Sequence, residues 1–88
     1  MSDLVFCRAM DAVIYVKNII DNYWKKEMDE KQLFIEIERV FSIPDNRVYF
    51  IRGSAFTPVA NTKLGKNRIN ELKRILLLID SVKYYNVV

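Results

Sequence analysis

The fold is decided by the stretch NRINELKRILLLID, which occupies residues 67–80. Its apolar residues recur at steps of three and four, which is the period of one face of an α-helix. These apolar residues are Ile69, Leu72, Ile75, Leu76 and Ile79. The other side of the same helix carries Lys66, Asn70, Glu71, Lys73 and Arg74. The stretch therefore predicts a helix with one face toward a core and one basic face, with Asn67 as its N-cap.

Two earlier segments can supply the rest of that core. Apolar residues at helical steps predict one helix from about Ser2 to Glu27, capped by Ser2 or Asp3, and a second from Asp29 to Phe41. Asp29 followed three residues later by Gln32 resembles a capping box. Pro44 ends the second helix, because proline disfavours helical geometry in the residue before it. Two helices joined by a short polar link form an antiparallel hairpin.

The segments between and after these helices are typical of β-structure. Arg47–Arg52 is β-branched and aromatic, and Gly53-Ser54 forms a turn that allows Ala55–Val59 to return as an edge strand. Ser81–Val88 is rich in Val and Tyr, which favours a short closing strand. The predicted fold class is α+β and mostly α, with a helical hairpin, a C-terminal basic helix and a small β-sheet.

Length and composition limit the kind of protein. A chain of 88 residues can form one domain, and with 51% hydrophobic residues it is expected to fold as a single domain over residues 1–88. The chain has no His and one Cys, which excludes a His general base, a Cys–His pair and a multi-Cys zinc site. We therefore expect a binding protein without cofactor or metal, and not an enzyme.

The N-terminus predicts a cytoplasmic protein. Asp3, Arg8 and Asp11 interrupt the apolar residues before an export signal can form. The longest wholly apolar stretch, Ile75–Ile79, is far shorter than the roughly 20 residues that a membrane span requires. A lone Cys7 fits a reducing compartment.

An alternative structure competes with the edge strand for residues 55–63. Thr57 to Lys63 can instead form the first helix of a helix-turn-helix, with Leu64-Gly65-Lys66 as the turn and the basic helix in the major groove of DNA. The spacing departs from the usual pattern, because Ala60 lies five positions before Gly65, where a small residue normally lies four before. Gly65 itself is typical of a left-handed turn that ends a short helix.

The charge distribution favours an anionic partner. Residues 1–44 carry six basic and eight acidic groups, whereas residues 45–88 carry eight basic and three acidic groups. A basic half attracts polyanions such as nucleic acid, and phosphate contacts supply most of such affinity. The lead hypothesis is a small regulator that binds nucleic acid through Arg47, Arg52, Lys63, Lys66, Asn70, Lys73 and Arg74.

Arg68 is expected to serve the fold. Its position on the helical wheel lies close to the apolar side, and a positive charge at a helix start opposes the macrodipole. A buried or half-buried Arg needs a carboxylate partner. We expect a structural ion pair with Glu36 or Glu38 of the second helix, in preference to a phosphate contact.

A second hypothesis comes from a weak apolar stripe on the first helix. Cys7, Met10 and Ile14 lie nearly opposite its main apolar face, and Ile35 is a further apolar residue of this kind on the second helix. These residues suit a protein interface. The alternative function is therefore a phage- or plasmid-type inhibitor or adaptor, similar to anti-CRISPR proteins, that binds and occludes a protein partner. The same stripe leaves a homodimer open.

The C-terminal half also resembles a known family. Residues 47–79, above all Leu64-Gly65-Lys66-Asn67-Arg68-Ile69 followed by Leu72, resemble a family of short, uncharacterised clostridial proteins with a Leu-Gly-Lys-x-Arg-aliphatic motif. The resemblance implies a cytosolic protein of the kind that mobile elements encode. It implies no catalytic residue.

Overall fold

The computed structural model describes residues 5–86, with side chains described through Asp80. The elements follow in the order α1 (Ala9–Trp24), α2 (Glu30–Phe41), α3 (Pro44–Arg47), β1 (Ile51–Arg52), β2 (Ala55–Phe56) and α4 (Pro58–Asn86). The described chain is mostly helical and carries one small antiparallel sheet, which confirms the predicted α+β, mostly α class.

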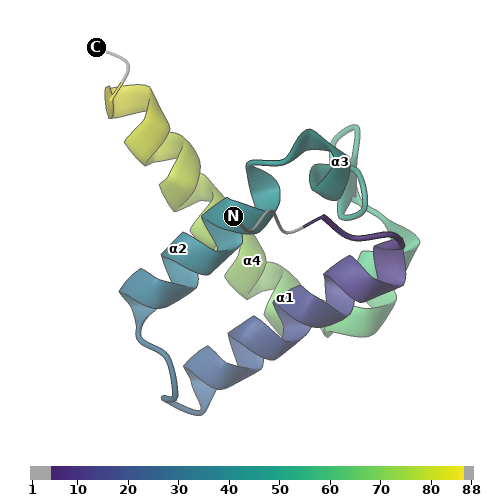
Figure 1. Cartoon of the computed structure of the whole chain (residues 1–88), viewed down its shortest axis with the longest axis horizontal. Helices are drawn as coiled ribbons and strands as arrows, with labels where there is room; N and C mark the ends of the chain where they lie inside the picture. Colours follow the sequence, from purple (N-terminus) through teal and green to yellow (C-terminus); the bar gives the residue numbers. More distant parts are fainter. Residues whose placement is uncertain (1–4, 87–88) are drawn as a thin grey trace.

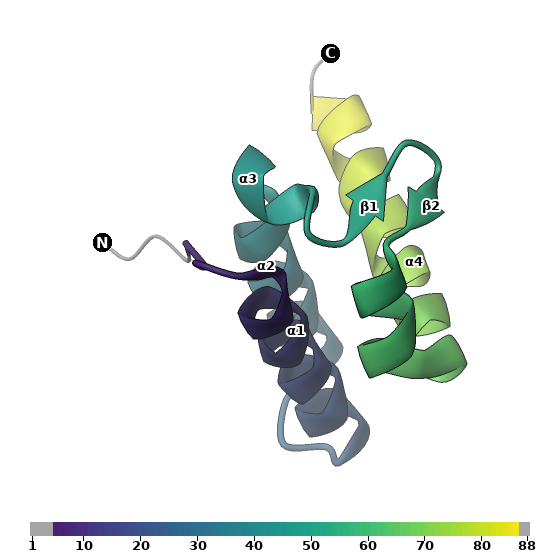
Figure 2. The same ribbon diagram turned by 90° about the vertical axis from the view of Figure 1, so that its right-hand side faces the viewer.

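The helices α1 and α2 form the predicted antiparallel hairpin, and α4 runs across it (Figure 1). Turned by 90°, the molecule shows two layers, with α1, α2 and α3 in one and the β-hairpin and α4 in the other (Figure 2). The apolar core lies where these layers meet, because each helix turns its buried stripe toward the other layer. Its fully buried large side chains are Val13, Val16, Ile20, Leu33, Ile37, Val40, Phe50, Leu64, Leu72 and Ile75.

The first helix begins later than the sequence predicts. It starts at Ala9, so neither Ser2 nor Asp3, which lie outside the described residues, caps it. The segment before Ala9 is held in another conformation: the Tyr49 hydroxyl donates to the Phe6 carbonyl oxygen at 3.0 Å, and the Phe6 ring lies 5.4 Å from that of Tyr15. Long-range contacts therefore replace the first predicted turns of helix.

The start of α2 confirms the predicted cap. The backbone N–H of Gln32 donates to Asp29 Oδ1 at 2.8 Å. The reciprocal half of a capping box is absent among the described contacts of Gln32, since its side-chain amide donates to Glu36 instead, at 2.8 Å. Capping depends on local spacing alone, which is why the sequence could predict it.

The predicted strand Arg47–Arg52 is wrong over most of its length. Pro44–Arg47 forms the helical turn α3, and strand geometry is confined to Ile51–Arg52. Tertiary contacts override the β-propensity of this segment: Asn46 is fully buried and donates its side-chain amide to the Val40 carbonyl, and Phe50 is fully buried against Phe41.

Both alternatives for residues 55–63 are partly right. Ala55–Phe56 pairs antiparallel with β1, with Ile51 opposite Phe56 and Arg52 opposite Ala55. The strand then stops short of the predicted Val59, because α4 begins at Pro58 and Thr57 caps it: the Ala60 N–H donates to Thr57 Oγ1 at 3.2 Å. Pro58 at the first helical position is compatible with this cap.

Gly65 divides α4 into two helical segments. Its dihedral angles, φ 79° and ψ 168°, are non-helical, and helical geometry resumes at Lys66. Asn67 therefore lies inside the helix and is not its cap. The expected end of a short helix at Gly65 is confirmed, and its φ is positive, but its ψ lies outside the left-handed helical region that was expected. Figure 2 shows the two segments running in different directions.

The predicted closing strand Ser81–Val88 is also wrong. The helix α4 continues through Asn86, and residues 87–88 lie outside the described part of the chain. A closing strand needs a sheet edge to pair with, whereas continuing the helix satisfies each backbone N–H locally. The sheet of the described residues consists of β1 and β2. Between residues 5 and 86, no helix has the length and apolar character needed to cross a membrane.

Candidate nucleic-acid interface

The second segment of α4 carries its basic stripe on its exposed side. Leu72, Ile75 and Ile79 face the core and are at most 3% exposed. Lys66, Asn70 and Lys73 are exposed and follow one another at steps of four and three residues, which places them in one line along the helix. The stripe therefore points away from the α1–α2 hairpin.

Most of the predicted nucleic-acid-binding cations make no ion pair with any described residue. The ion pairs of residues 5–80 involve Arg8, Lys17, Arg39, Arg68 and Arg74. Of the seven residues predicted to bind nucleic acid, five are cations outside this set and one is neutral Asn70. These five are Arg47, Arg52, Lys63, Lys66 and Lys73. We call these five cations and Asn70 the basic face.

Two members of the basic face flank one groove. Arg47 at the end of α3 and Lys73 on α4 border a groove of about 330 Å³ between the β-hairpin and α4. The Arg47 guanidinium lies 5.9 Å from the centre of the Phe41 ring, and the Lys73 ammonium lies 6.0 Å from the centre of the Phe56 ring. The remaining lining residues of the groove are Ile51, Ser54, Phe56, Leu76, Leu77 and Asp80.

Arg52 and Lys63 do not line this groove and lie near the start of α4. Each borders a shallow hollow of about 220 Å³, and Pro58 and Val59 line both hollows. Met10 lines the hollow of Lys63. The basic face is therefore not one compact cluster: Arg47 and Lys73 meet at the groove, whereas Arg52 and Lys63 flank the start of α4.

Arg74 is engaged within the fold. Its guanidinium donates to Glu71 Oε2 through Nε at 2.9 Å and to Glu30 Oε2 through Nη1 at 3.2 Å. Hydrogen bonding to Glu71 raises the pKa of Arg74. The indole N–H of Trp24 also donates to Glu71, at 3.4 Å. The structure therefore ties Arg74 to the α1–α2 hairpin, away from the stripe of Lys66 and Lys73.

Arg68 has a carboxylate partner, but the partner is not the predicted one. It forms a two-point ion pair with Asp21 of α1, through Nε to Oδ1 at 2.8 Å and Nη2 to Oδ2 at 3.2 Å. Hydrogen bonding from Arg68 lowers the pKa of Asp21. The prediction of Glu36 or Glu38 is wrong because the start of this segment of α4 lies beside the end of α1, and Glu36 is bound instead by Tyr15, Gln32 and Arg39.

The predicted protein-interface residues are all exposed, and of the four only Met10 lines a described hollow. Met10 and Ile14 lie one turn apart on α1 and are 39% and 41% exposed. Cys7 precedes the helix and is exposed. Ile35 lies on α2, two residues from both buried Leu33 and buried Ile37, so it faces away from the core. Met10 lines a hollow with the start of α4, and Ile35 lines none of the described hollows.

The sequence did not identify two residues of the groove, Leu77 and Phe56, as functional candidates. Leu77 is 68% exposed, and Phe56 is half-buried beneath Lys73. The sequence does indicate that Leu77 is exposed, because Leu77 lies in an apolar run but not on the apolar face of the helix. The position of Phe56 depends on the β-hairpin, whose pairing was uncertain from sequence.

No group of three or more His, Cys, Asp or Glu side chains placed to hold a metal ion occurs among the residues that the structure describes. The chemistry of the basic face is thus that of cations, amides and apolar side chains.

Comparison with known proteins places the chain in a family. The sequence model of a family described as conserved hypothetical proteins matches residues 11–77, which is most of the chain. The chain belongs to this family, so the resemblance of residues 47–79 to a family of uncharacterised proteins is confirmed, and the match extends into α1 and α2. Searches of curated proteins and of solved structures found no match.

Proposed function

We propose that this protein is a small non-enzymatic regulator that binds nucleic acid through the basic face. The observation that carries the proposal is the stripe of Lys66, Asn70 and Lys73, which lies on the exposed side of α4 and whose cations have no carboxylate partner among the described residues. Unpaired cations exchange water and counterions for phosphates without first breaking an internal ion pair.

The local architecture supports the proposal. The short segment of α4 before Gly65, capped by Thr57, leads into the longer segment that carries the stripe. A short helix, a turn and a second exposed helix are the parts of a helix-turn-helix, in which side chains of the second helix contact phosphates and base edges. Asn70 lies between two lysines, and Asn is a side chain that reads adenine.

The experiment is fluorescence anisotropy with a labelled 20-base-pair duplex and a labelled single strand of the same length. Binding through about four to five phosphate contacts predicts an affinity that falls by a factor of several hundred between 50 and 200 mM salt. Lys66→Glu/Lys73→Glu is expected to abolish binding at 50 mM salt. No binding of either probe by the wild-type chain at 50 mM salt would refute the proposal.

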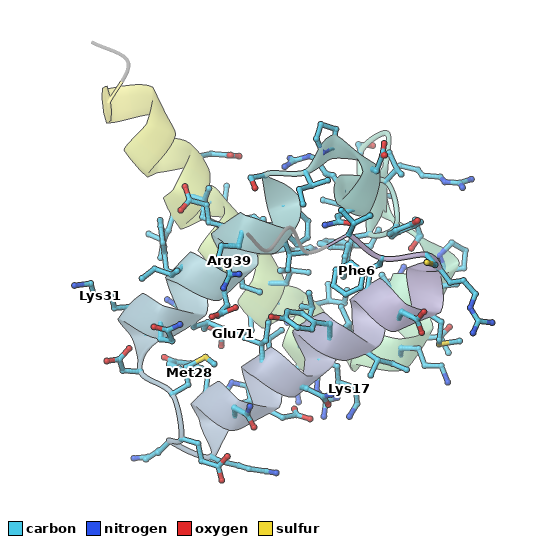
Figure 3. The ribbon with its side chains drawn as sticks, in the orientation of Figure 1. Phe6, Lys17, Met28, Lys31, Arg39 and Glu71 are labelled. Carbon is cyan, nitrogen blue, oxygen red and sulfur yellow. The ribbon has the colours of Figure 1, made fainter. Side chains whose placement is uncertain are left out.

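A matched control separates the basic face from net charge. Lys25 and Lys31 are exposed and make no ion pair with described residues, and both belong to the α1–α2 end of the molecule. Lys31 projects from the N-terminal end of α2 in Figure 3. Lys25→Glu/Lys31→Glu changes the net charge by the same amount and is expected to retain most of the binding. Equal losses in the two double variants would mean that net charge alone, and not the basic face, binds the probe.

A protein partner is the second candidate function, as an inhibitor or adaptor of the phage or plasmid type. It is favoured by one observation: Met10 and Ile14 are exposed side by side on α1, and Met10 continues into the apolar hollow with Pro58 and Val59. Affinity capture from a bacterial lysate with wild-type and Met10→Lys/Ile14→Lys baits tests it, and a partner retained equally by both baits argues against this surface. Both candidate functions place the protein in the cytoplasm.

A further inference from the structure

The groove between the β-hairpin and α4 is chemically unlike the rest of the basic face. Four apolar side chains line it, namely Ile51, Phe56, Leu76 and Leu77. Leu77 is 68% exposed, which is the largest exposure of any large apolar side chain among the described residues. Such a surface gains most from burying another apolar side chain.

The charges around the groove are arranged along α4. Four lining residues of α4 form one stripe that faces the β-hairpin, because they follow at steps of three, one and three residues. They are Lys73, Leu76, Leu77 and Asp80. At the rise of an α-helix, Lys73 and Asp80 are separated by about 10 Å along the axis. Arg47 adds a second cation on the opposite wall. Neither Arg47 nor Lys73 has a carboxylate partner among the described residues, and Asp80 likewise makes no ion pair there.

These features favour a peptide over a nucleic acid as the occupant. Base stacking needs a free aromatic face, but the one aromatic ring that lines the groove, Phe56, has the Lys73 ammonium 6.0 Å from its centre. The aliphatic lining residues Ile51, Leu76 and Leu77 offer no hydrogen bond to a base edge, and the carboxylate of Asp80 repels a phosphate at one end. An apolar side chain with a carboxylate on one side and a cation on the other complements every one of these groups.

We propose that the groove binds an extended segment of a partner protein in which an apolar side chain lies between an acidic and a basic residue. Side chains of an extended chain alternate between its two faces, so three side chains that all face the groove lie at every second residue and span about 13 Å, at roughly 3.3 Å per residue. The flexible side chains of Lys73 and of the basic peptide residue cover the difference from the roughly 10 Å between Lys73 and Asp80. The acidic residue pairs with Lys73 or Arg47, the apolar residue packs on Phe56 and Leu77, and the basic residue pairs with Asp80. The groove shares Arg47 and Lys73 with the basic face, whereas Leu77 lies outside the basic face, so a change at Leu77 tests the peptide proposal separately from nucleic-acid binding.

The test is a selection from a displayed library of random 12-residue peptides on the full immobilised chain. We expect enrichment of peptides in which an apolar residue lies two positions from an acidic residue on one side and two positions from a basic residue on the other, so that all three side chains share one face. The best peptide, labelled, is then titrated by anisotropy, and amide shifts of the ¹⁵N-labelled protein locate it. Shifts centred on Ser54, Phe56, Lys73 and Leu77 support the proposal, and shifts centred elsewhere overturn it.

Variants make the result specific to the groove. Leu77→Ser is expected to weaken peptide binding at least tenfold, and Leu78→Ser, which changes a neighbouring exposed leucine outside the groove lining, is the matched control. Lys73→Glu is expected to weaken binding of the peptide. The same variant is expected to bind more tightly a peptide in which Lys replaces the acidic residue. Thermal melts confirm that each variant folds.

Three outcomes overturn the proposal. One is the absence of any enriched pattern, and another is a peptide that binds Leu77→Ser as tightly as wild type. The third outcome concerns a labelled single-stranded oligonucleotide. If Leu77→Ser weakens binding of the oligonucleotide as much as it weakens binding of the peptide, the groove belongs to a nucleic-acid site. An oligonucleotide whose binding is unchanged by Leu77→Ser but weakened by Lys66→Glu, a change outside the groove lining, supports a separate peptide groove.

Discussion

Arg68 of α4 and Asp21 of α1 join the two layers of the fold through a two-point ion pair, with nitrogen–oxygen distances of 2.8 and 3.2 Å. The guanidinium also donates to the Leu64 carbonyl oxygen at 3.0 Å and lies 5.7 Å from the centre of the Trp24 ring. The two charged side chains are only 27% and 21% exposed. One side chain therefore fixes the segment of α4 after Gly65, the segment before it and the end of α1 relative to one another.

Arg68→Ala is expected to lower the free energy of unfolding by about 1–3 kcal/mol, since charge-assisted hydrogen bonds in a half-buried site are lost together. Urea unfolding followed by the fluorescence of Trp24, the single tryptophan of the chain, measures this change. The control is Arg8→Ala, because Arg8 is 80% exposed and 3.9 Å from Asp11, and its removal is expected to cost about 0–0.5 kcal/mol. Equal stability losses in the two variants would contradict a structural role for Arg68.

The same ion pair predicts a pH dependence of stability. Arg68 holds the pKa of Asp21 below its usual range in the folded protein, so the unfolded chain takes up a proton at a higher pH than the folded chain does. The contribution of Asp21 is therefore complete above about pH 4, the usual pKa of Asp, and is lost as the pH falls through the lowered folded pKa. Wild type is expected to be more stable than Asp21→Asn at pH 7, with the difference shrinking toward pH 2. A difference independent of pH would contradict the ion pair.

The sequence predicted the helices because their stabilising pattern is repeated along the chain. Leu33, Ile37 and Phe41 are spaced for one helical face, and all three are buried in α2. Asp29 was predictable as a cap for the same reason. The boundaries of α1 and the strand at Arg47–Arg52 were not predictable in this way, because Tyr49 binds the Phe6 carbonyl across 43 residues and burial of Asn46 bends the chain into α3.

The candidate site was predictable in its residue types and not in its pairings. Exposure of Lys66, Asn70 and Lys73 follows from the helical wheel. The engagement of Arg74 does not, because Glu30 lies 44 residues away and meets Arg74 only when α4 crosses α2. For Arg68, the sequence indicated a carboxylate partner, but the choice of Asp21 depends on where α4 contacts α1.

Lys66 and Arg74 are expected to contribute unequally to nucleic-acid binding. Lys66→Ala is expected to reduce the slope of log affinity against log salt by about 1, because one phosphate contact is lost. Arg74→Ala is expected to leave that slope nearly unchanged and to lower thermal stability, because Arg74 is bound to Glu71 and Glu30. Anisotropy titrations at four salt concentrations measure both slopes. A larger slope change for Arg74→Ala would mean that its ion pairs open on binding.

The exposed apolar residues of α1, Met10 and Ile14, are the surface tested for self-association. If Met10 and Ile14 form a contact between two copies, Ile14→Lys is expected to shift the protein to the monomer mass at concentrations where wild type is a dimer. Sedimentation equilibrium at several loading concentrations measures this mass. Ile35→Lys is the matched variant on α2, and a dimer disrupted only by that variant would place the contact on α2.

Gly65 sets the direction of the basic stripe, and its substitution is expected to affect stability and binding together. An added Cβ meets no atom within 4 Å, so the cost of Gly65→Ala comes from the backbone alone. With φ 79° and ψ 168°, Gly65 occupies a region that is nearly exclusive to glycine, and an alanine there costs about 1–3 kcal/mol.

Gly53→Asn is the control. Gly53, with φ 62°, is compatible with the left-handed conformation that asparagine tolerates, and this change is expected to cost about 1 kcal/mol or less. We expect the strain in Gly65→Ala to be relieved by turning the two segments of α4 relative to each other, which changes the position of Lys63 relative to Lys66. Nucleic-acid affinity is therefore expected to fall even below the melting transition. Chemical denaturation and anisotropy on both variants measure the two effects, and unchanged affinity in a destabilised Gly65→Ala variant would show that Lys63 and Lys66 bind independently.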